Sequence, residues 1–188
     1  MRVFKVVFVG DSGVGKTSII NSFLGRDVSN VRSTIGVDFY TINMSGKQLV
    51  IWDFAGQEWF RDIVVQFLTG AFVVVMVFDL SRPETLINLE KQWMNYVLEF
   101  NRPAKVIIVG NKSDIKTIPD DVIINTVDKI KEKLNVEFYI ETCALTRENI
   151  PKVFDAIFEA IKLAYLVESI KEKESINKYV PMAEMSNM

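Results

Sequence analysis

Residues 10–17 read Gly-Asp-Ser-Gly-Val-Gly-Lys-Thr, which is the spacing G-x-x-x-x-G-K-[ST] of a phosphate-binding loop. In such a loop, backbone N–H groups and a helix N-terminus face the phosphate oxygens. Lys16 would reach the β- and γ-phosphates, and Thr17 would offer a hydroxyl to Mg²⁺. We prefer this interpretation to an ordinary glycine-rich turn because an apolar run precedes the motif and a helical pattern follows it. The predicted phosphate contacts are Asp11, Ser12, Gly13, Val14, Gly15, Lys16, Thr17 and Ser18.

A second polar motif, Asn111-Lys112-Ser113-Asp114, follows an apolar run that ends near Gly110. A carboxylate such as that of Asp114 can accept both the N1 proton and the exocyclic amine of guanine, a pair of donors that adenine lacks. Lys112 could lay its aliphatic stem across the base. An N-K-x-D string alone is more often a polar loop. Its place downstream of a phosphate-binding loop favours a guanine nucleotide, bound by Asn111, Lys112 and Asp114.

The elements that must position these motifs alternate along the chain. Short apolar runs at residues 3–9, 50–52, 72–78, 106–109 and 136–140 indicate buried strands. Between and after them, apolar residues recur at the helical period of 3.6, in stripes that we assign to the core. These stripes contain Ile19, Ile20, Phe23 and Leu24; Leu86, Leu89, Trp93, Val97 and Phe100; and Val153, Phe154, Ile157, Ile161 and Ala164.

Such alternation predicts an α/β fold, a mostly parallel sheet with helices on both faces, whose ligand site lies at the carboxyl ends of the strands. Ser81 and Glu84 have the spacing of a capping box, and Pro83 suits a first helical turn, so a helix should begin there.

Over about residues 3–165 the sequence resembles the Ras superfamily, and its local motifs are most similar to those of Rab proteins. Ser-Thr-Ile-Gly-Val-Asp-Phe at residues 33–39 resembles the Rab switch I, and Trp-Asp-Phe-Ala-Gly-Gln-Glu at residues 52–58 resembles switch II. The resemblance implies a P-loop NTPase G domain with a six-stranded sheet. It also implies a slow GTP hydrolase that switches conformation to control effector binding, in vesicle trafficking or signalling.

By the same resemblance, Thr34 would close over Mg²⁺ and the γ-phosphate, and Asp53 would hold the ligands that surround the metal. Gly56 would sense the γ-phosphate through its N–H, and Gln57 would orient the attacking water. Residues 142–145, Thr-Cys-Ala-Leu, lie where the family places a loop whose alanine N–H contacts the guanine O6. Cys143, Ala144 and Leu145 are the corresponding candidates.

Two alternatives stay open at this point. The protein could be a binding module that holds GTP as a structural ligand and hydrolyses it negligibly, and Gln57 is the residue that separates the two hypotheses. Arg32 could act on the γ-phosphate in cis, although a solvated switch arginine is the simpler interpretation. An ATP-dependent P-loop kinase is disfavoured by Asp114 and by the lack of an arginine-rich lid.

Phe39, Trp52 and Phe67 coincide with the aromatic triad through which Rab proteins contact effectors. Effector, exchange-factor and activating proteins would therefore bind these residues and the switches. The simpler alternative is three ordinary sheet or core aromatics, because aromatic residues favour strands.

The sequence also departs from the family pattern. Thr34 and Asp53 are 19 positions apart, counted as 53 − 34, which is closer to Arf than to Rab proteins and predicts a short hairpin. The family usually places an aromatic ring against the guanine shortly before switch I, where this chain has Asp27 and Val28. Leu145 stands where the family has lysine. We therefore expect weak packing on the base and fast nucleotide exchange. Phe54 replaces the usual threonine, with little expected effect on chemistry.

Composition restricts the remaining functions. The 188 residues fit one domain, which we place at residues 1–168, followed by a disordered tail at 169–188. Lys and Arg number 22 and Asp and Glu 24, with no basic block, so we expect no nucleic-acid partner. The absence of histidine excludes Ser-His and Cys-His pairs.

The cysteine count and the two ends of the chain bear on where the protein acts. A single cysteine, Cys143, cannot form an internal disulfide. No signal peptide is expected before residue 10, and no cysteine near the C-terminus offers a lipid anchor. We expect a cytoplasmic monomer that reaches membranes only through partners.

Overall fold

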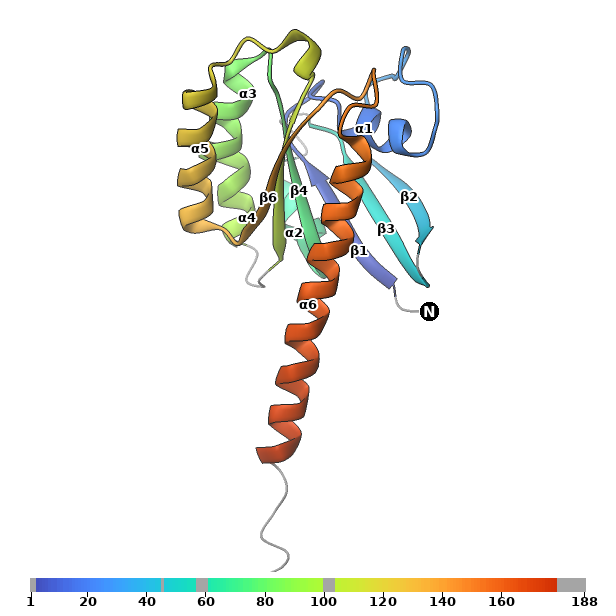
Figure 1. Ribbon diagram of the computed structural model, residues 1–188, viewed down its shortest axis with the longest axis vertical. Coiled ribbons are helices and arrows are strands. Elements are labelled where there is room, and N and C mark those ends of the chain that lie inside the picture. The colour runs from blue at the N-terminus through green and yellow to red at the C-terminus, as the bar shows by residue number, and fades with distance from the viewer. Residues whose placement is uncertain (1–2, 45, 57–60, 100–103, 179–188) are drawn as a thin grey trace, which may run out of the picture.

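The computed structural model describes residues 3–44, 46–56, 61–99 and 104–178. Within them, six strands form one sheet in the order β2-β3-β1-β4-β5-β6 (Figure 1). β2 and β3 pair antiparallel, and every other neighbouring pair is parallel. The fold is thus the predicted α/β architecture with a mostly parallel, six-stranded sheet. The strands are β1 (Val3–Val9), β2 (Val37–Met44), β3 (Lys47–Phe54), β4 (Ala71–Asp79), β5 (Lys105–Asn111) and β6 (Val136–Thr142).

Helices cover both faces of this sheet, as expected. Successive residues of β1 point to opposite faces, so that Phe8 packs in one core cluster and Val7 in the other. The first cluster is closed by α1 (Lys16–Phe23) and α6 (Ile150–Lys178). The second is closed by the remaining helices, which lie across the sheet from α6 (Figure 1). These are α2 (Arg61–Leu68), α3 (Pro83–Asn88), α4 (Met94–Glu99) and α5 (Asp120–Lys133).

α3 begins at Pro83, which confirms the predicted helix start, but the predicted capping box is wrong. The N-cap is Arg82, whose side chain makes no capping hydrogen bond. The Ser81 hydroxyl instead donates to Oδ1 of Asp79 at 2.6 Å. The hydroxyl lies at the buried carboxylate because a charge-assisted hydrogen bond is about twice as strong as the neutral one that a hydroxyl oxygen would accept from a helix N–H.

The apolar stripe from Leu86 to Val97 does form one helical stretch, but its period is interrupted. A π-helical turn, η2 (Leu89–Trp93), joins α3 to α4. Such turns insert one extra residue into a helix and often occur beside functional sites. Phe100, which we assigned to the same stripe, lies outside the described residues.

Two further expectations concern the switches and the C-terminal end. β2 and β3 pair from Val37 with Phe54 to Met44 with Lys47, so the hairpin between the switch motifs is short, as the spacing predicts. α6 continues to Lys178, so residues 169–178 are helical where we expected a disordered tail. Residues 179–188 lie outside the described residues, and the domain division itself stays a prediction. Within the described part of the chain, none of the helices combines the length and the apolar character needed to cross a membrane.

Candidate functional site

A cavity of about 360 Å³ opens at the carboxyl edge of the sheet. Its walls come from the loops that follow β1, β3, β5 and β6 and from the segment before β2. Parallel strands end at one edge, and the structure therefore brings five parts of the chain into one site. The predicted site residues that line the cavity are Ser12, Gly13, Gly15, Lys16, Thr17, Ser18, Thr34, Gly56, Asn111, Lys112, Asp114, Cys143, Ala144 and Leu145.

Lys16 is the cation at the centre of the loop after β1. Its side chain is buried, and Nζ donates to the carbonyl oxygens of Gly10 at 2.7 Å and Asp11 at 2.8 Å. Burial lowers the pKa of Lys16 to about 8, although the charges of Asp53 and Asp11 oppose this shift. An anion in the cavity would stabilise the ammonium further, which is the electrostatic requirement of a phosphate site.

Asp11 and Val14 belong to the same loop but do not line the cavity. The Asp11 carboxylate accepts from the Trp93 indole Nε1 at 2.8 Å and from Asn88 Nδ2 at 2.6 Å. Val14 is fully buried in the core. The side chains of these two residues therefore anchor the loop, and their contact with a phosphate would be limited to backbone N–H groups.

Gly15 is one of the positions at which this loop requires glycine. Its φ is +98°, and a Cβ there would lie 2.2 Å from Nδ2 of Asn111. That amide donates to the Val14 carbonyl oxygen at 2.9 Å, which ties the loop after β5 to the loop after β1. Glycine is thus needed both for the backbone conformation and for the contact between the two loops.

Three predicted metal ligands, Thr17, Thr34 and Asp53, meet at the bottom of the cavity. The Thr17 Oγ1 lies 2.8 Å from the Thr34 Oγ1 and donates to Oδ2 of Asp53 at 2.5 Å. Burial raises the pKa of the Asp53 carboxyl to about 6, against the hydrogen bond from Thr17 and the charge of Lys16. The Asp53 Oδ1 is buried and has no hydrogen-bond partner among the described residues. Hard oxygen donors with an unsatisfied carboxylate oxygen fit a Mg²⁺ ion.

Gly56 brings the start of switch II against the phosphate loop. A Cβ on Gly56 would lie 2.2 Å from the Asp11 carbonyl carbon and 2.3 Å from the Ser12 backbone nitrogen. The backbones can therefore approach this closely only with glycine at this position. Gln57, the predicted catalytic residue, lies outside the described residues.

The predicted base loops also lie together. Oδ1 of Asn111 accepts from the Ala144 backbone N–H at 3.2 Å and from the Thr142 hydroxyl at 3.1 Å. The Cys143 thiol is buried and donates to Oδ1 of Asp114 at 3.1 Å. Asn111 and Cys143 therefore position the loops, while Asp114 lines the cavity where a base would lie.

The two departures from the family pattern also reach the cavity. Val28 is half-buried and lines it, and Leu145 lines it with 64% of its surface exposed. Asp27 does not line it, because its carboxylate accepts from the backbone N–H and hydroxyl of Ser29. The apolar contact available to a base from this side is therefore limited to aliphatic side chains.

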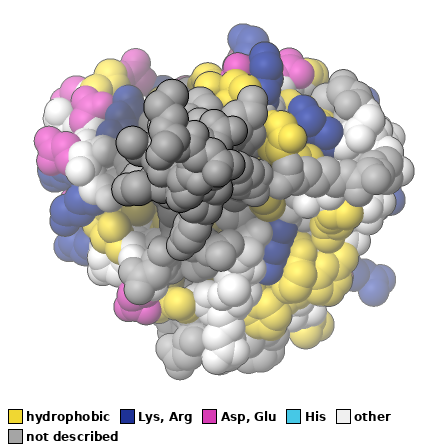
Figure 2. All heavy atoms as spheres, turned by 90° about the horizontal axis from the view of Figure 1, so that it is seen from below, with side chains coloured by type: hydrophobic (Ala, Val, Ile, Leu, Met, Phe, Trp, Pro, Cys, Tyr) yellow, Lys and Arg dark blue, Asp and Glu magenta, His cyan; other side chains and the backbone are white. Residues whose placement is uncertain are grey.

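Away from the cavity, Trp52 contacts both Phe39 and Phe67. The ring centroids of Phe39 and Trp52 are 4.7 Å apart, and those of Trp52 and Phe67 are 5.8 Å apart. Phe39 is 58% exposed, whereas the other two rings are half-buried. Figure 2 shows hydrophobic side chains gathered on the side of the molecule that carries β2 and β3 in Figure 1.

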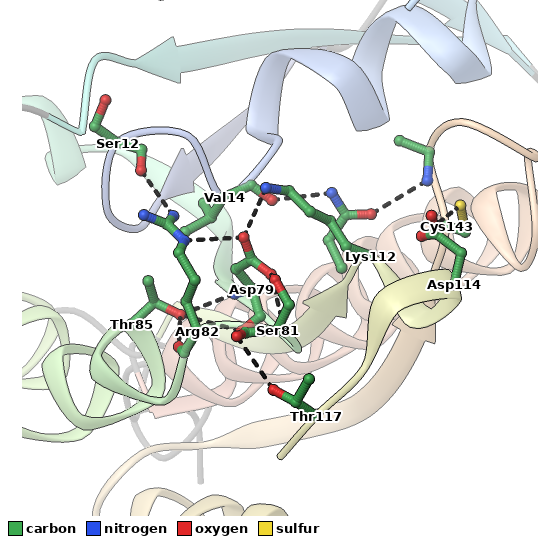
Figure 3. A network of polar contacts seen from close by, with 12 residues as sticks. Ser12, Val14, Asp79, Ser81, Arg82, Thr85, Lys112, Asp114, Thr117 and Cys143 are labelled. Carbon is green, nitrogen blue, oxygen red and sulfur yellow. Dashed lines mark hydrogen bonds and ion pairs between the residues drawn. The ribbon is translucent and has the colours of Figure 1, made fainter.

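For four residues near the site, the sequence did not predict a role in holding its loops. Asn88 and Trp93 hold Asp11, and Asp79 with Arg82 forms a network between the loops after β1 and β5 (Figure 3). Trp93 was assigned to the core by its helical spacing. A charged residue at the end of the apolar run Ala71–Asp79 was the one available sign of the network.

A phosphate-binding loop between the first strand and first helix of a mostly parallel sheet defines a P-loop nucleoside triphosphatase fold. The family model described as the Ras family matches residues 5–163. The Ras-related protein RABC2a of Arabidopsis thaliana is 34% identical over 181 residues, covering 93% of this chain and 84% of that protein.

Two further relatives have similar identity. The Ras-related protein SEC4 of Saccharomyces cerevisiae is 36% identical over 185 residues, covering 95% of this chain and 80% of that protein. The Ras-related protein YPTC6 of Chlamydomonas reinhardtii is 37% identical over 165 residues, covering 85% and 75%. The chain therefore belongs to the Ras family and is a Rab-like small GTPase, as its switch motifs suggested.

Proposed function

We propose that this protein binds GTP and GDP together with Mg²⁺, hydrolyses GTP slowly, and uses the change of state to control effector binding in vesicle trafficking or signalling. The observation that carries the proposal is the meeting of Thr17, Thr34 and Asp53 at 2.8 and 2.5 Å. Thr34 comes from switch I and Thr17 from the phosphate loop. A ligand that holds both can order switch I, and loss of that ligand can release it.

Each residue has a role that follows from its chemistry. Lys16 and the backbone N–H groups of the phosphate loop would hold the phosphates, and Thr17, Thr34 and Asp53 would hold Mg²⁺. The bound ion would neutralise charge on the phosphate oxygens. Gly56 would offer its N–H to the γ-phosphate, and Gln57 would orient water.

The proposed rate is slow because such sites usually receive an arginine from an activating protein, which raises the rate by about 10³- to 10⁵-fold. Arg32 lines the cavity but is exposed on switch I. This placement fits a solvated side chain better than a group that acts on the γ-phosphate.

The direct test of the ligand is to denature the purified protein and identify the nucleotide that it carried. We expect GDP or GTP, because Asp114 lines the cavity and its carboxylate matches the two donors of guanine. Recovery of ATP, or of no nucleotide after purification in Mg²⁺, would contradict the base assignment.

Replacement of Gln57 by leucine tests hydrolysis against the alternative of a GTP-loaded binding module. Leucine keeps the size of the side chain but cannot orient water, so we expect single-turnover hydrolysis to slow by about 10²-fold or more. Gln48→Leu, near the start of β3 and so at the opposite end of that strand from the site, is the matched control and should leave the rate unchanged. Equal rates for the wild type and Gln57→Leu would favour the binding module.

Val28→Phe tests the proposal that nucleotide exchange is fast. An aromatic ring at this half-buried, cavity-lining position would pack on the base, so release of mant-GDP should slow by about three- to tenfold. Val122→Phe, which makes the same change at an exposed valine of α5, should not alter release. A wild-type release time of many hours without an exchange factor would exclude fast exchange.

We also propose that effectors bind the surface formed by Phe39, Trp52 and Phe67 together with the switches. In support, Phe39 is exposed, Trp52 contacts both other rings, and an exposed aromatic cluster is typical of protein interfaces. The alternative, an ordinary packed cluster, applies to Trp52 and Phe67 in part, because both also contact the buried core.

A further inference from the structure

Asp79, the last residue of β4, is a fully buried carboxylate beside the nucleotide cavity. It does not line the cavity. Its Oδ1 accepts from the Ser81 backbone N–H at 2.9 Å and from the Ser81 hydroxyl at 2.6 Å. Its Oδ2 accepts from Arg82 Nε at 3.0 Å and from Lys112 Nζ at 2.6 Å. Figure 3 shows these contacts converging on the one carboxylate.

The surroundings keep this buried group charged. Burial alone would raise the pKa of Asp79, but hydrogen bonds from Lys112, Ser81 and Arg82 together hold that pKa below its usual value. A buried carboxylate that loses its cations is strongly destabilised, because its charge is then neither solvated nor paired. Asp79 therefore constrains the positions of both cations.

Arg82 connects the carboxylate to the phosphate loop. Its Nη2 donates to the Ser12 carbonyl oxygen at 3.0 Å, across 70 positions of sequence. The guanidinium is planar, so an arginine held by Asp79 at Nε presents Nη2 in a fixed direction. The position of Ser12, between Gly10 and Gly13 of the loop, is thereby tied to β4.

Lys112 connects the same carboxylate to the base loop. Its backbone is left-handed, with φ 68° and ψ 48°, and it immediately precedes η3 (Ser113–Ile115), which contains Asp114. The register of the sheet pairs Asp79 with Asn111, so Lys112 begins next to the carboxylate. With Nζ held by Asp79, the aliphatic stem of Lys112 is fixed where it lines the cavity.

We propose that Asp79 is a positioning residue that couples the phosphate loop to the base loop, through Arg82 on one side and Lys112 on the other. The inference rests on the proposed binding of guanine nucleotide, and it concerns how tightly that nucleotide is held. Asp79 itself does not line the cavity. It acts by fixing the two loops in one relative position, so that phosphates and base are held together.

A double-mutant cycle between Arg82 and Lys112 tests the coupling. The variants are Arg82→Ala and Lys112→Met, which keeps the aliphatic stem and removes the ammonium, and the measurement is the mant-GDP release rate. Either change already breaks the link between the two loops, so the second change should add little to the first. The double variant should therefore release GDP about fivefold more slowly than the product of the single effects. In an Asp79→Asn background the effects should multiply. Multiplication in both backgrounds would overturn the inference.

Asp79→Asn alone provides a second measurement that does not depend on the multiple variants folding. The amide keeps the shape but loses the charge, so we expect mant-GDP release to rise about tenfold or more. The rise in Tm on adding saturating GDP should also shrink, because that increment reports affinity. A purely structural role would lower Tm equally with and without GDP, leave the increment unchanged, and overturn the inference.

Controls separate this inference from the proposed function. Asp128→Asn, which makes the same change at an exposed residue of α5, should leave both release and the Tm increment unchanged. If the wild-type protein binds no mant-GDP, the proposed function fails and the inference fails with it. If the wild type binds and Asp79→Asn behaves like the wild type in release and in Tm increment, the inference alone fails.

Discussion

Asp114→Asn is expected to lower the affinity for GDP by about 10⁴-fold and to transfer binding to xanthosine diphosphate. The Asp114 carboxylate, which lines the cavity and is held by the Cys143 thiol, only accepts hydrogen bonds from a base. Asparagine would place an NH₂ donor opposite a donor of guanine. Xanthine has a carbonyl oxygen in place of the exocyclic amine and would accept from that NH₂. Sites that pair hydrogen-bonding groups discriminate against mismatched ligands by about 10⁴- to 10⁵-fold.

The measurement is a competition titration of mant-GDP against GDP and against xanthosine diphosphate for both proteins. Asp121→Asn, at an exposed position in the first turn of α5, is the matched control and should keep the wild-type preference. If Asp114→Asn retained GDP and ignored xanthosine diphosphate, a residue other than Asp114 would contact the base edge. The fold of this variant should be unaffected, because Asp114 is exposed.

Gly56→Ala is expected to slow single-turnover GTP hydrolysis by about 10²-fold or more while leaving GDP affinity within a fewfold of wild type. The new Cβ would lie 2.2 Å from the Asp11 carbonyl carbon and 2.5 Å from the Asp11 oxygen, both backbone atoms. The start of switch II would have to move away from the phosphate loop. A displacement of about 1 Å in a catalytic group is enough to reduce a rate 10²-fold.

GDP lacks the γ-phosphate that the Gly56 N–H would contact, and its binding is therefore an internal control for folding. Gly70→Ala measures the cost of backbone strain without a steric contact, because its φ is +79° and, apart from its chain neighbours, no atom of the described residues lies within 4 Å of the new Cβ. The contrary result is that Gly56→Ala hydrolyses GTP at the wild-type rate and keeps the wild-type ratio of affinities for a non-hydrolysable GTP analogue and for GDP. That result would show that switch II does not need to approach the phosphate loop so closely.

Both predictions depend on contacts between loops, and the same is true of the anchor beneath the phosphate loop. The π-helical turn η2 lies between Asn88 and Met94, and it ends at Trp93, whose indole reaches Asp11. Asn88 and Trp93 are five positions apart, counted as 93 − 88, and both hydrogen-bond the Asp11 carboxylate. In a regular α-helix residues five apart point away from one another, so the extra residue of the π-turn brings them to one side.

Sequence alone determined the ligand class and the general fold of this protein. The phosphate loop at residues 10–17 and the base motif at residues 111–114 are contiguous, and the chemistry of each follows from residue types at fixed spacing. The α/β order followed from apolar runs alternating with helical stripes, because local periodicity reports which side of each element is buried.

Tertiary structure decided how these pieces are held together. The Trp93 to Asp11 and Arg82 to Ser12 contacts join residues 82 and 70 positions apart, and no local pattern reports which distant group a side chain will meet. Ser81 has the spacing of a helix cap but donates to Asp79, because a hydrogen bond to a buried charge is stronger than the neutral one that its oxygen would accept from a helix N–H. The sequence therefore specified which groups would contact a nucleotide, and the packing of β4, α3 and the loops decided which groups keep them in place.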